Sequence, residues 1–159
     1  MRLGEKKNSM ATNTKLLIVG EKKWWTKNME LVYKGMQFKN EVIFINRLSG
    51  NELNNVIASA LALTYVSNFE GFGIPILEAM YCETPVITSN VTSMPEVGGD
   101  AVLLVDPACT DSITHAMMNV AKDQKLRERL INKGKIQRQK FSWDKTSDLL
   151  WQSIEKAIA

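Results

Sequence analysis

The feature of this 159-residue sequence that most constrains its fold is a regular alternation of short apolar runs and longer helical stretches. Runs rich in aliphatic and β-branched residues lie at 16–19, 42–45, 61–66, 86–88 and 102–105. Helical patterns lie at 26–39, 50–60, 74–82, 110–122, 124–140 and 143–158. Strands that alternate with helices form parallel sheets, and runs that are apolar throughout suit strands covered on both faces. The sequence therefore predicts an α/β fold, a Rossmann-like doubly wound parallel sheet with helices on both faces.

The length and composition are those of one ordinary globular domain, with 45% hydrophobic and 23% charged residues. We expect this domain to span residues 15–159, and residues 1–14 to be disordered or the remnant of a preceding helix. The net charge of +3 is too small to indicate nucleic-acid binding. Cys82 and Cys109 suggest reduced packing residues, and no apolar run approaches the roughly 20 residues of a membrane span. We therefore expect a cytoplasmic protein.

The stretch 67–80, SNFEGFGIPILEAM, has the pattern of a strand end, a glycine-containing turn and a helix that opens with proline. Gly71 and Gly73 allow a tight bend and a close approach of the backbone to a ligand. The N–H groups of residues 72–74, at the positive end of the helix dipole, favour an anion. Glu78 lies among apolar residues, where an ionised carboxylate needs hydrogen-bond partners such as sugar hydroxyls. The stretch thus predicts a ligand with both phosphate and hydroxyl groups, such as a nucleotide sugar.

Glu70 and Glu78 are separated by seven residues that include Gly-Phe-Gly. This pair resembles the paired-glutamate motif of the retaining group-one (family four) glycosyltransferases, which have the glycosyltransferase B fold. The similarity continues in the family's order through residues 84–89, 93–101, 104–107 and 141–143. It implies the C-terminal, donor-binding half of that fold.

The resemblance also implies a role for each residue of the motif. Glu70 would contact the donor sugar as the catalytic residue, and Glu78 would bind the ribose. The residues that would bind the donor phosphates and sugar are Gly71, Phe72, Gly73 and Ile74. Arg47 and Leu48, after the second apolar run, would lie against the nucleobase. The implied reaction moves a hexose from a UDP- or GDP-linked donor to a glycan or lipid-linked acceptor in polysaccharide biosynthesis, without a cofactor, metal ion or enzymic nucleophile.

The sequence departs from the family near its N-terminus. In the family, the donor domain begins one strand and one helix earlier, and the turn after that strand supplies an Arg and a Lys to the phosphates. Arg2 and Lys7 have a suitable spacing for this turn, but no strand pattern precedes them. We therefore expect a fragment that is inactive alone and lacks the first strand, the first helix and the N-terminal acceptor domain. The missing strand would leave open sheet edges at residues 16–19 and 61–66, through which copies of the chain could associate.

Each proposed site residue has a structural alternative. Glu70 could be an exposed loop acid, and Glu78 could be a glutamate paired with a nearby base. The pair Arg47 and Leu48 could form a plain surface turn. The apolar surroundings of Glu78 offer no cation three or four residues away, which favours a ligand-binding role for this residue.

Three other features have alternative interpretations. Trp24 and Trp25 could stack on a base, although Trp before an amphipathic helix more often packs in a core. The helix at 122–140 carries eight Lys or Arg residues and could contact an acidic membrane surface, although a solvated face is the simpler interpretation. His115 has no acidic partner nearby in sequence, so we do not expect it to act as a catalytic base.

Two functions from different classes fit the sequence. The first is the donor-binding half of a retaining glycosyltransferase. The alternative is a non-catalytic module that binds a nucleotide or assembles with another polypeptide. A dinucleotide oxidoreductase does not fit, because Gly20 is followed by Glu-Lys-Lys and not by a G-x-G-x-x-G pattern.

Overall fold

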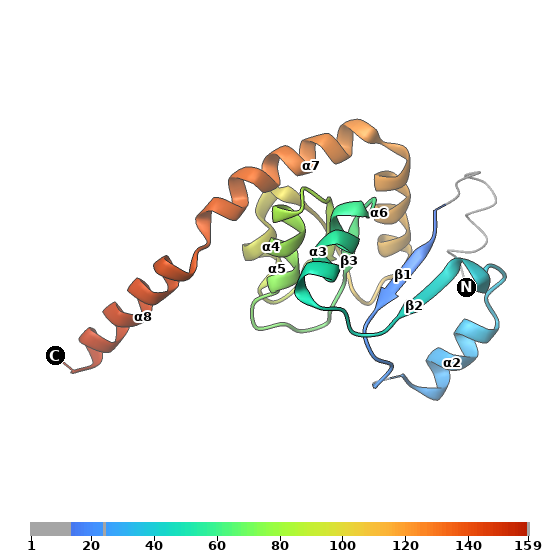
Figure 1. The fold of residues 1–159 in the computed structure, drawn as a ribbon, viewed down its shortest axis with the longest axis horizontal. Helices are drawn as coiled ribbons and strands as arrows, with labels where there is room; N and C mark the ends of the chain where they lie inside the picture. The colour runs from blue at the N-terminus through green and yellow to red at the C-terminus, as the bar shows by residue number, and fades with distance from the viewer. Residues whose placement is uncertain (1–13, 24, 159) are drawn as a thin grey trace. The chain divides into compact units, whose positions relative to one another are not determined.

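A computed structural model describes residues 14–23 and 25–158 (Figure 1). The chain divides into two compact units, Met1–Val56 and Ile57–Ala159, and each contains its own parallel sheet. Arg2 and Lys7, the residues with the spacing of a phosphate-binding turn, lie outside the described residues, and so does Trp24.

The first unit is built on a two-stranded parallel sheet. Its elements are β1 (Leu16–Val19), α2 (Lys27–Lys34), the 3-10 helix η1 (Lys39–Glu41) and β2 (Val42–Ile45). The Thr26 hydroxyl caps α2 by accepting from the Met29 N–H at 3.2 Å. α2 ends at Lys34, with Gly35 as its C-cap, so the predicted helix at 26–39 is too long. The next element, α3 (Gly50–Ser59), crosses the division between the two units.

β1 and β2 are less covered than their apolar sequences predict. Neither strand contains a fully buried residue, and Leu17 is 37% and Ile43 40% exposed. Within the described residues each of these strands pairs only with the other, which leaves one backbone edge of each without a partner strand. The side chains of these two strands are therefore half-buried to exposed, although both strands are apolar throughout.

The second unit is built on a three-stranded parallel sheet with β4 in the centre. Its strands are β3 (Leu63–Tyr65), β4 (Val86–Ser89) and β5 (Val102–Val105). Its first helices are α4 (Ile74–Tyr81), α5 (Met94–Gly98), the 3-10 helix η2 (Gly99–Ala101), α6 (Thr110–Lys122) and α7 (Gln124–Gln137). All four residues of β4 are buried. The predicted α/β architecture of parallel strands and intervening helices is confirmed, as two separate ladders.

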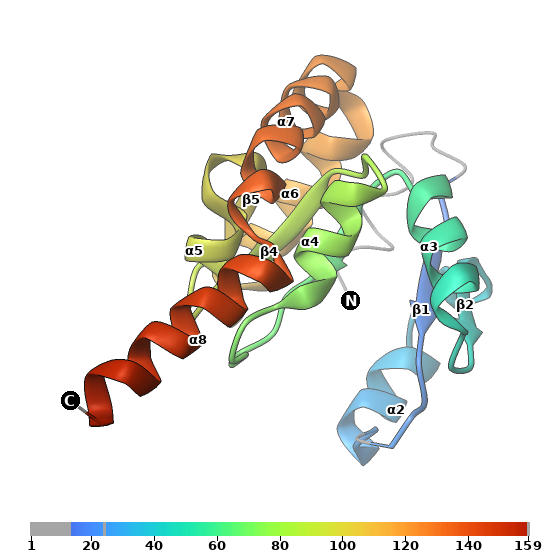
Figure 2. The same cartoon turned by 60° about the vertical axis from the view of Figure 1, so that its left-hand side comes forward.

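The core of the second unit lies on both sides of β4. Ile87 packs with Val105 and with apolar side chains of α6 and α7. Strand alternation turns Val86 and Thr88 to the opposite face, and α4 and α5 also pack on β4 (Figure 2). Among the described residues β3 pairs only with β4, and β1 only with β2. Association of copies through these edges stays a prediction.

The C-terminal helices differ in their burial. α7 is followed by the 3-10 helix η3 (Arg138–Lys140), so the predicted helix at 124–140 changes its winding after Gln137. α8 (Trp143–Ile158) matches its predicted range but contains no buried residue. Its exposed large apolar side chains are Trp143, Leu149, Leu150, Trp151, Ile154 and Ile158. Among the described residues, none of the helices combines the length and apolarity that a bilayer span would need.

Candidate functional site

The candidate site is the loop of residues 66–73, which joins β3 to α4. It lies at the carboxyl end of a parallel strand, where α/β sheets commonly bind ligands. Gly73 is the N-cap of α4, with a φ angle of 97° and no side-chain cap. No side chain caps α4, Pro75 has no N–H, and the Ile76 N–H donates to the Gly73 carbonyl at 3.0 Å. The Ile74 N–H, which has no partner among the described residues, is therefore the first-turn group that can face an anion.

Gly71 and Gly73 differ in what the protein itself requires of them. At Gly73 the backbone is left-handed, and an added Cβ would lie 3.2 Å from Cδ1 of Ile76. At Gly71 the φ angle is not in the positive range, and an added Cβ would meet nothing within 4 Å. The fold therefore requires glycine at position 73 and leaves open space at position 71.

Two buried hydroxyl groups of β4 hold the start of the loop. The Thr88 hydroxyl donates to the Tyr65 carbonyl at 2.7 Å. The Ser89 hydroxyl donates to the Ser67 carbonyl at 2.5 Å. Both Thr88 and Ser89 are fully buried, so these hydrogen bonds fix the loop to the centre of the sheet.

The turn after β4 holds the middle of the loop. The Ser93 hydroxyl lies 3.0 Å from the Glu70 carbonyl and 2.9 Å from the Phe72 carbonyl, so its single proton can serve either acceptor. The Glu70 N–H donates to the Thr92 hydroxyl at 3.4 Å. Residues 88–93 thus position the backbone of Glu70 from outside its own loop.

Glu70 and Glu78 both contribute to raising the pKa of Tyr65, the last residue of β3. Burial, followed by the influence of the Glu70 carboxylate and the negative charge of Glu78, raises the pKa of Tyr65 to about 12. Tyr65 is therefore protonated at neutral pH, and the structure brings the influence of both predicted glutamates to one side chain.

Glu78 is half-buried in α4 and makes no ion pair with any residue that the structure describes. Burial, together with the charge of Glu78, raises the pKa of the Cys82 thiol at the end of this helix. The structural alternative, in which Glu78 pairs with a nearby base, is not found in the described part of the chain.

The loop also presents apolar side chains. Phe72 packs edge-to-face against Phe141, with 5.7 Å between the ring centroids. Phe69 is 77% exposed and Ile74 is 50% exposed. The contact gives a physical reason for Phe141, which supports the loop from the chain that precedes α8.

Arg47 and Leu48 follow β2 in the first unit, as expected. Arg47 is exposed and Leu48 is half-buried, and their contact with a nucleobase stays a prediction. Trp25 packs edge-to-face with Tyr33 and Phe44, at centroid distances of 6.2 and 5.4 Å, which confirms its packing role.

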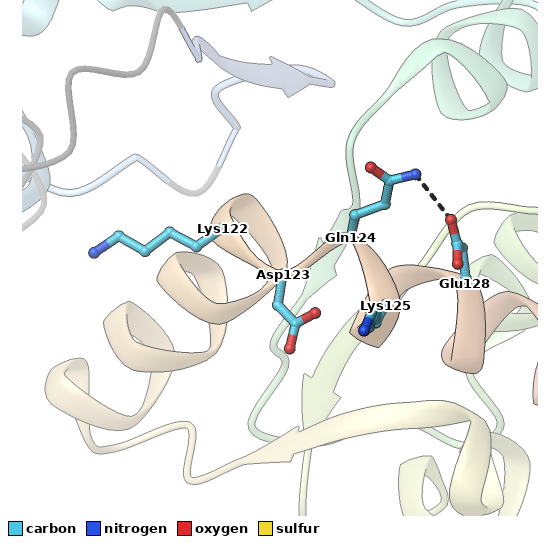
Figure 3. A pocket seen from close by; sticks show the side chains of 5 residues that line it. All are labelled: Lys122, Asp123, Gln124, Lys125 and Glu128. Atoms are coloured by element: carbon cyan, nitrogen blue, oxygen red, sulfur yellow. Dashed lines mark hydrogen bonds between the residues drawn. The ribbon is translucent and has the colours of Figure 1, made fainter.

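An open hollow of about 550 Å³ lies at the junction of α6 and α7 and shares no residue with the candidate loop. Its lining residues are Lys122, Asp123, Gln124, Lys125 and Glu128. Figure 3 shows Gln124 hydrogen-bonded to Glu128, at 2.8 Å, with Lys122 pointing away from them. Asp123 accepts from the Leu126 N–H at 2.9 Å and caps α7. The side chains of Asp123, Gln124 and Glu128 are thus engaged in local hydrogen bonds. No cluster of potential metal ligands occurs among the residues that the structure describes.

Sequence reasoning missed the side chains that support the loop, above all Tyr65, Thr88, Ser89 and Ser93. A signal for three of them is present in the sequence. Tyr65 is the second-last residue of the apolar run at 61–66, and Thr88 and Ser89 lie at and just after the end of the run at 86–88, so all three are polar groups at the carboxyl ends of strands.

A family model described as glycosyl transferases group 1 matches residues 3–137. The O-antigen chain mannosyltransferase B of Escherichia coli is 39% identical over 115 residues, which are 72% of this chain and 30% of that protein. The chain thus spans about 30% of the length of this curated relative.

Two solved structures are similar in fold. One is the C-terminal domain of a glycosyl transferase group 1 family protein from Francisella tularensis, with a TM-score of 0.67 and 26% identity. This likeness covers 77% of this chain and 67% of that one. The other is Anabaena Alr3699/HepE in complex with UDP-glucose, with a TM-score of 0.79 and 15% identity. It covers 98% of this chain and 45% of that one, and at this identity it shows the fold alone.

Proposed function

The chain belongs to the group 1 glycosyl transferases, and on this premise we propose that it binds the nucleotide-sugar donor of a retaining hexosyltransferase. The observation that carries the proposal is the loop of residues 66–73. It combines the uncapped start of α4 with two glutamates, Glu70 and Glu78, whose charges both reach Tyr65. A nucleoside diphosphate sugar requires this combination, because it presents an anionic diphosphate beside hydroxyl groups.

We assign the donor's parts to the site as follows. The diphosphate lies against the backbone of residues 71–74, where the open space at Gly71 admits a close approach. The donor sugar lies against the Glu70 carboxylate. The ribose hydroxyls donate to Glu78, which has no ion pair within the described residues to compete with them. Arg47 and Leu48 lie against the nucleobase.

In this proposal the chain acts mainly by stabilising the leaving group. The bond between the anomeric carbon and the diphosphate breaks, and the backbone N–H groups at the start of α4 stabilise the charge that develops on the phosphate. The acceptor attacks from the face that the diphosphate leaves, so the anomeric configuration is retained without an enzymic nucleophile. Acceptor binding belongs to a separate domain, and we expect no sugar transfer by these 159 residues alone.

Names of similar proteins support a hexose donor, and one of them names a UDP carrier. The Escherichia coli relative is named a mannosyltransferase, and the Anabaena structure is described as a complex with UDP-glucose. The expected cytoplasmic location and the alternative of contact with a membrane surface stay predictions.

Calorimetric titration of the chain with UDP, GDP and ADP tests the proposal. We expect one of the diphosphates to bind, and Gly73→Val to abolish that binding while the sheet stays assembled. A β-branched side chain would crowd the phosphate position and strain a backbone with φ of 97°. A matched control is Gly50→Val, at a position in the first turn of α3 where an added Cβ meets nothing within 4 Å. Absence of binding by all three nucleotides, or unchanged binding by Gly73→Val, would contradict the proposal.

A further inference from the structure

The chain between α7 and α8 contacts α4 at its C-terminal end and the candidate loop just before its N-terminal end. Arg138 of η3 donates to the carbonyls of the last two residues of α4, at 2.9 and 3.3 Å. The ring of Phe141 packs edge-to-face on the ring of Phe72, with 5.7 Å between the centroids. Residues 138–141, which we call the α4 clamp, thus hold this helix on both sides.

Arg138 fixes the C-terminal end of α4 through more than one contact. A cation at this end of a helix complements the helix dipole. The guanidinium carbon also lies 4.9 Å from the centroid of the Tyr81 ring, so the ring holds the group as well. One turn earlier in α7, Gly134 packs closely on α4, because an added Cβ would lie 3.3 Å from Cγ of Met80. The end of α4 is therefore tightly held against the end of α7.

Phe72 is held at both its backbone and its ring. The Ser93 hydroxyl lies 2.9 Å from the Phe72 carbonyl, and Phe141 contacts its ring. The Phe141 N–H donates to the Arg138 carbonyl at 3.2 Å, which joins the two contacts of the clamp. Phe72 lies two residues before Ile74, whose N–H can face an anion, so a shift of Phe72 would also shift this group.

We propose that Arg138 and Phe141 are positioning residues for the diphosphate of the donor, which hold the start of α4 in the geometry that binds it. This inference rests on the proposed function and adds to it two residues from outside the loop. Neither residue contacts the donor in this proposal. A loop and helix that are already held in place need less ordering when the ligand binds, so the affinity for the diphosphate is higher.

The first test measures the affinity for UDP and GDP by calorimetry. Phe141→Leu keeps an apolar side chain but removes the ring, and we expect the affinity for the diphosphate that binds the parent to fall about 3- to 10-fold. Phe141→Tyr keeps the ring, so its affinity should stay within about 2-fold of the parent value. Trp143→Leu, at a tryptophan that is 80% exposed, is the matched control and should leave the affinity unchanged.

A double-variant cycle separates positioning from a general structural role. Phe72→Leu removes the other ring of the pair and should weaken binding as much as Phe141→Leu does. The double variant should bind within about 2-fold of either single variant, because each single change already removes the contact. Phe72 is 42% exposed, so Phe72→Leu also tests the contact if Phe141→Leu does not fold.

The other end of the clamp is tested with the same titrations. Arg138→Met removes the charge and both hydrogen bonds, and it should weaken diphosphate binding about 3-fold or more. Arg138→Lys should restore the affinity to within about 2-fold of the parent, because one nitrogen, Nη1, makes both bonds and an ammonium group can replace it. Arg129→Met, at an exposed position of α7, is the control.

The outcomes separate the two proposals. A parent chain that binds neither diphosphate overturns the proposed function. Binding by the parent with equal affinity in Phe141→Leu or in Phe72→Leu overturns the role of the clamp and leaves the proposed function intact. Losses that multiply in the double variant, or an equal loss in Trp143→Leu, would also overturn it, since either result indicates a general effect on the fold. Parent-like binding by Arg138→Met would remove Arg138 from the clamp.

Discussion

The two parallel sheets of this protein differ in side-chain burial, and the difference is the opposite of what the apolarity of their strands suggests. β1 and β2 consist entirely of apolar residues, yet neither has a buried side chain. β4 ends in Thr88 and Ser89, yet all four of its residues are buried. Apolarity thus identifies these segments as strands, but it does not show which strand is central.

The difference lies in what the polar residues of β4 do. Thr88 and Ser89 can be buried because each hydroxyl donates to a carbonyl at the start of the candidate loop, those of Tyr65 and Ser67. A buried hydroxyl with a partner avoids most of the cost of losing water, and it fixes the partner as well. The central strand therefore combines a packing role with support of the proposed site, whereas β1 and β2 do neither in the described residues.

The largest expected effect compares one substitution in the two ladders. Ile87→Ala removes a side chain that is 1% exposed, so it should lower the free energy of unfolding by about 2–5 kcal/mol. Ile43→Ala removes one that is 40% exposed, and it should cost about 1 kcal/mol or less. Urea unfolding of both variants and the parent, followed by circular dichroism, measures the two losses. Equal losses would show that Ile43 of β2 is as well packed as Ile87 of β4, and that the two sheets do not differ in burial.

The next effect tests the buried hydroxyl of β4. Thr88→Val keeps the shape of the side chain but leaves the Tyr65 carbonyl without its donor, so we expect a loss of about 1–3 kcal/mol in stability. Thr64→Val, on an exposed position of β3, makes the same change and should be nearly neutral. The same urea series gives both values. A neutral Thr88→Val would mean that this hydroxyl does not support the loop.

Much of the fold is predictable because it depends on local pattern. The strand and helix positions follow from apolar runs and helical periodicity, and the turn at residues 71–75 follows from glycine and proline chemistry. α5 is missed because its five residues are too few to show a period. The low burial of β1 and β2 is missed because burial depends on which strands become neighbours, and local sequence does not specify this.

The residues of the site that lie in one contiguous stretch are also predictable, but those that the fold brings in from elsewhere are not. The spacing of Glu70 and Glu78 and the helix start at Gly73 are visible in one contiguous stretch. Ser93 is not, because it reaches the Glu70 carbonyl from the turn after β4. Such contacts arise from the register of a parallel sheet, which sets the ends of neighbouring strands side by side.

A smaller effect, on binding, separates a ligand-binding carboxylate from a packing one. Glu78→Gln should weaken nucleoside diphosphate binding by about 1–3 kcal/mol, the range of a charge-assisted hydrogen bond. Stability should be unchanged or higher, because a half-buried charge without an ion pair in the described residues is removed. Glu96→Gln, on an exposed position of α5, is the control. Equal affinity of Glu78→Gln and the parent, measured by calorimetry, would remove ribose binding from Glu78.

The smallest expected effect concerns Tyr65 at the end of β3. Its hydroxyl should make the free energy of unfolding depend on pH in the alkaline range. The pKa of Tyr65 is raised from 10.0 to about 12 in the folded chain. A group whose pKa is raised by folding contributes stability that is fully present below the unfolded value and is lost as pH rises through the folded one. Tyr65 should therefore contribute fully below pH 10, and its contribution should disappear between about pH 10 and 12.

Because Tyr65 is only half-buried, solvent screening should keep this contribution to roughly 1 kcal/mol or less. Other groups also titrate in this range, so the quantity to measure is the difference in unfolding free energy between the parent and Tyr65→Phe from pH 8 to 12. The parent should lose its advantage over the variant as the pH rises, and Tyr81→Phe should follow the parent throughout. A difference that stays constant with pH would mean that folding does not raise the pKa of Tyr65. β4 would then support the backbone of the loop without affecting the ionisation of this side chain.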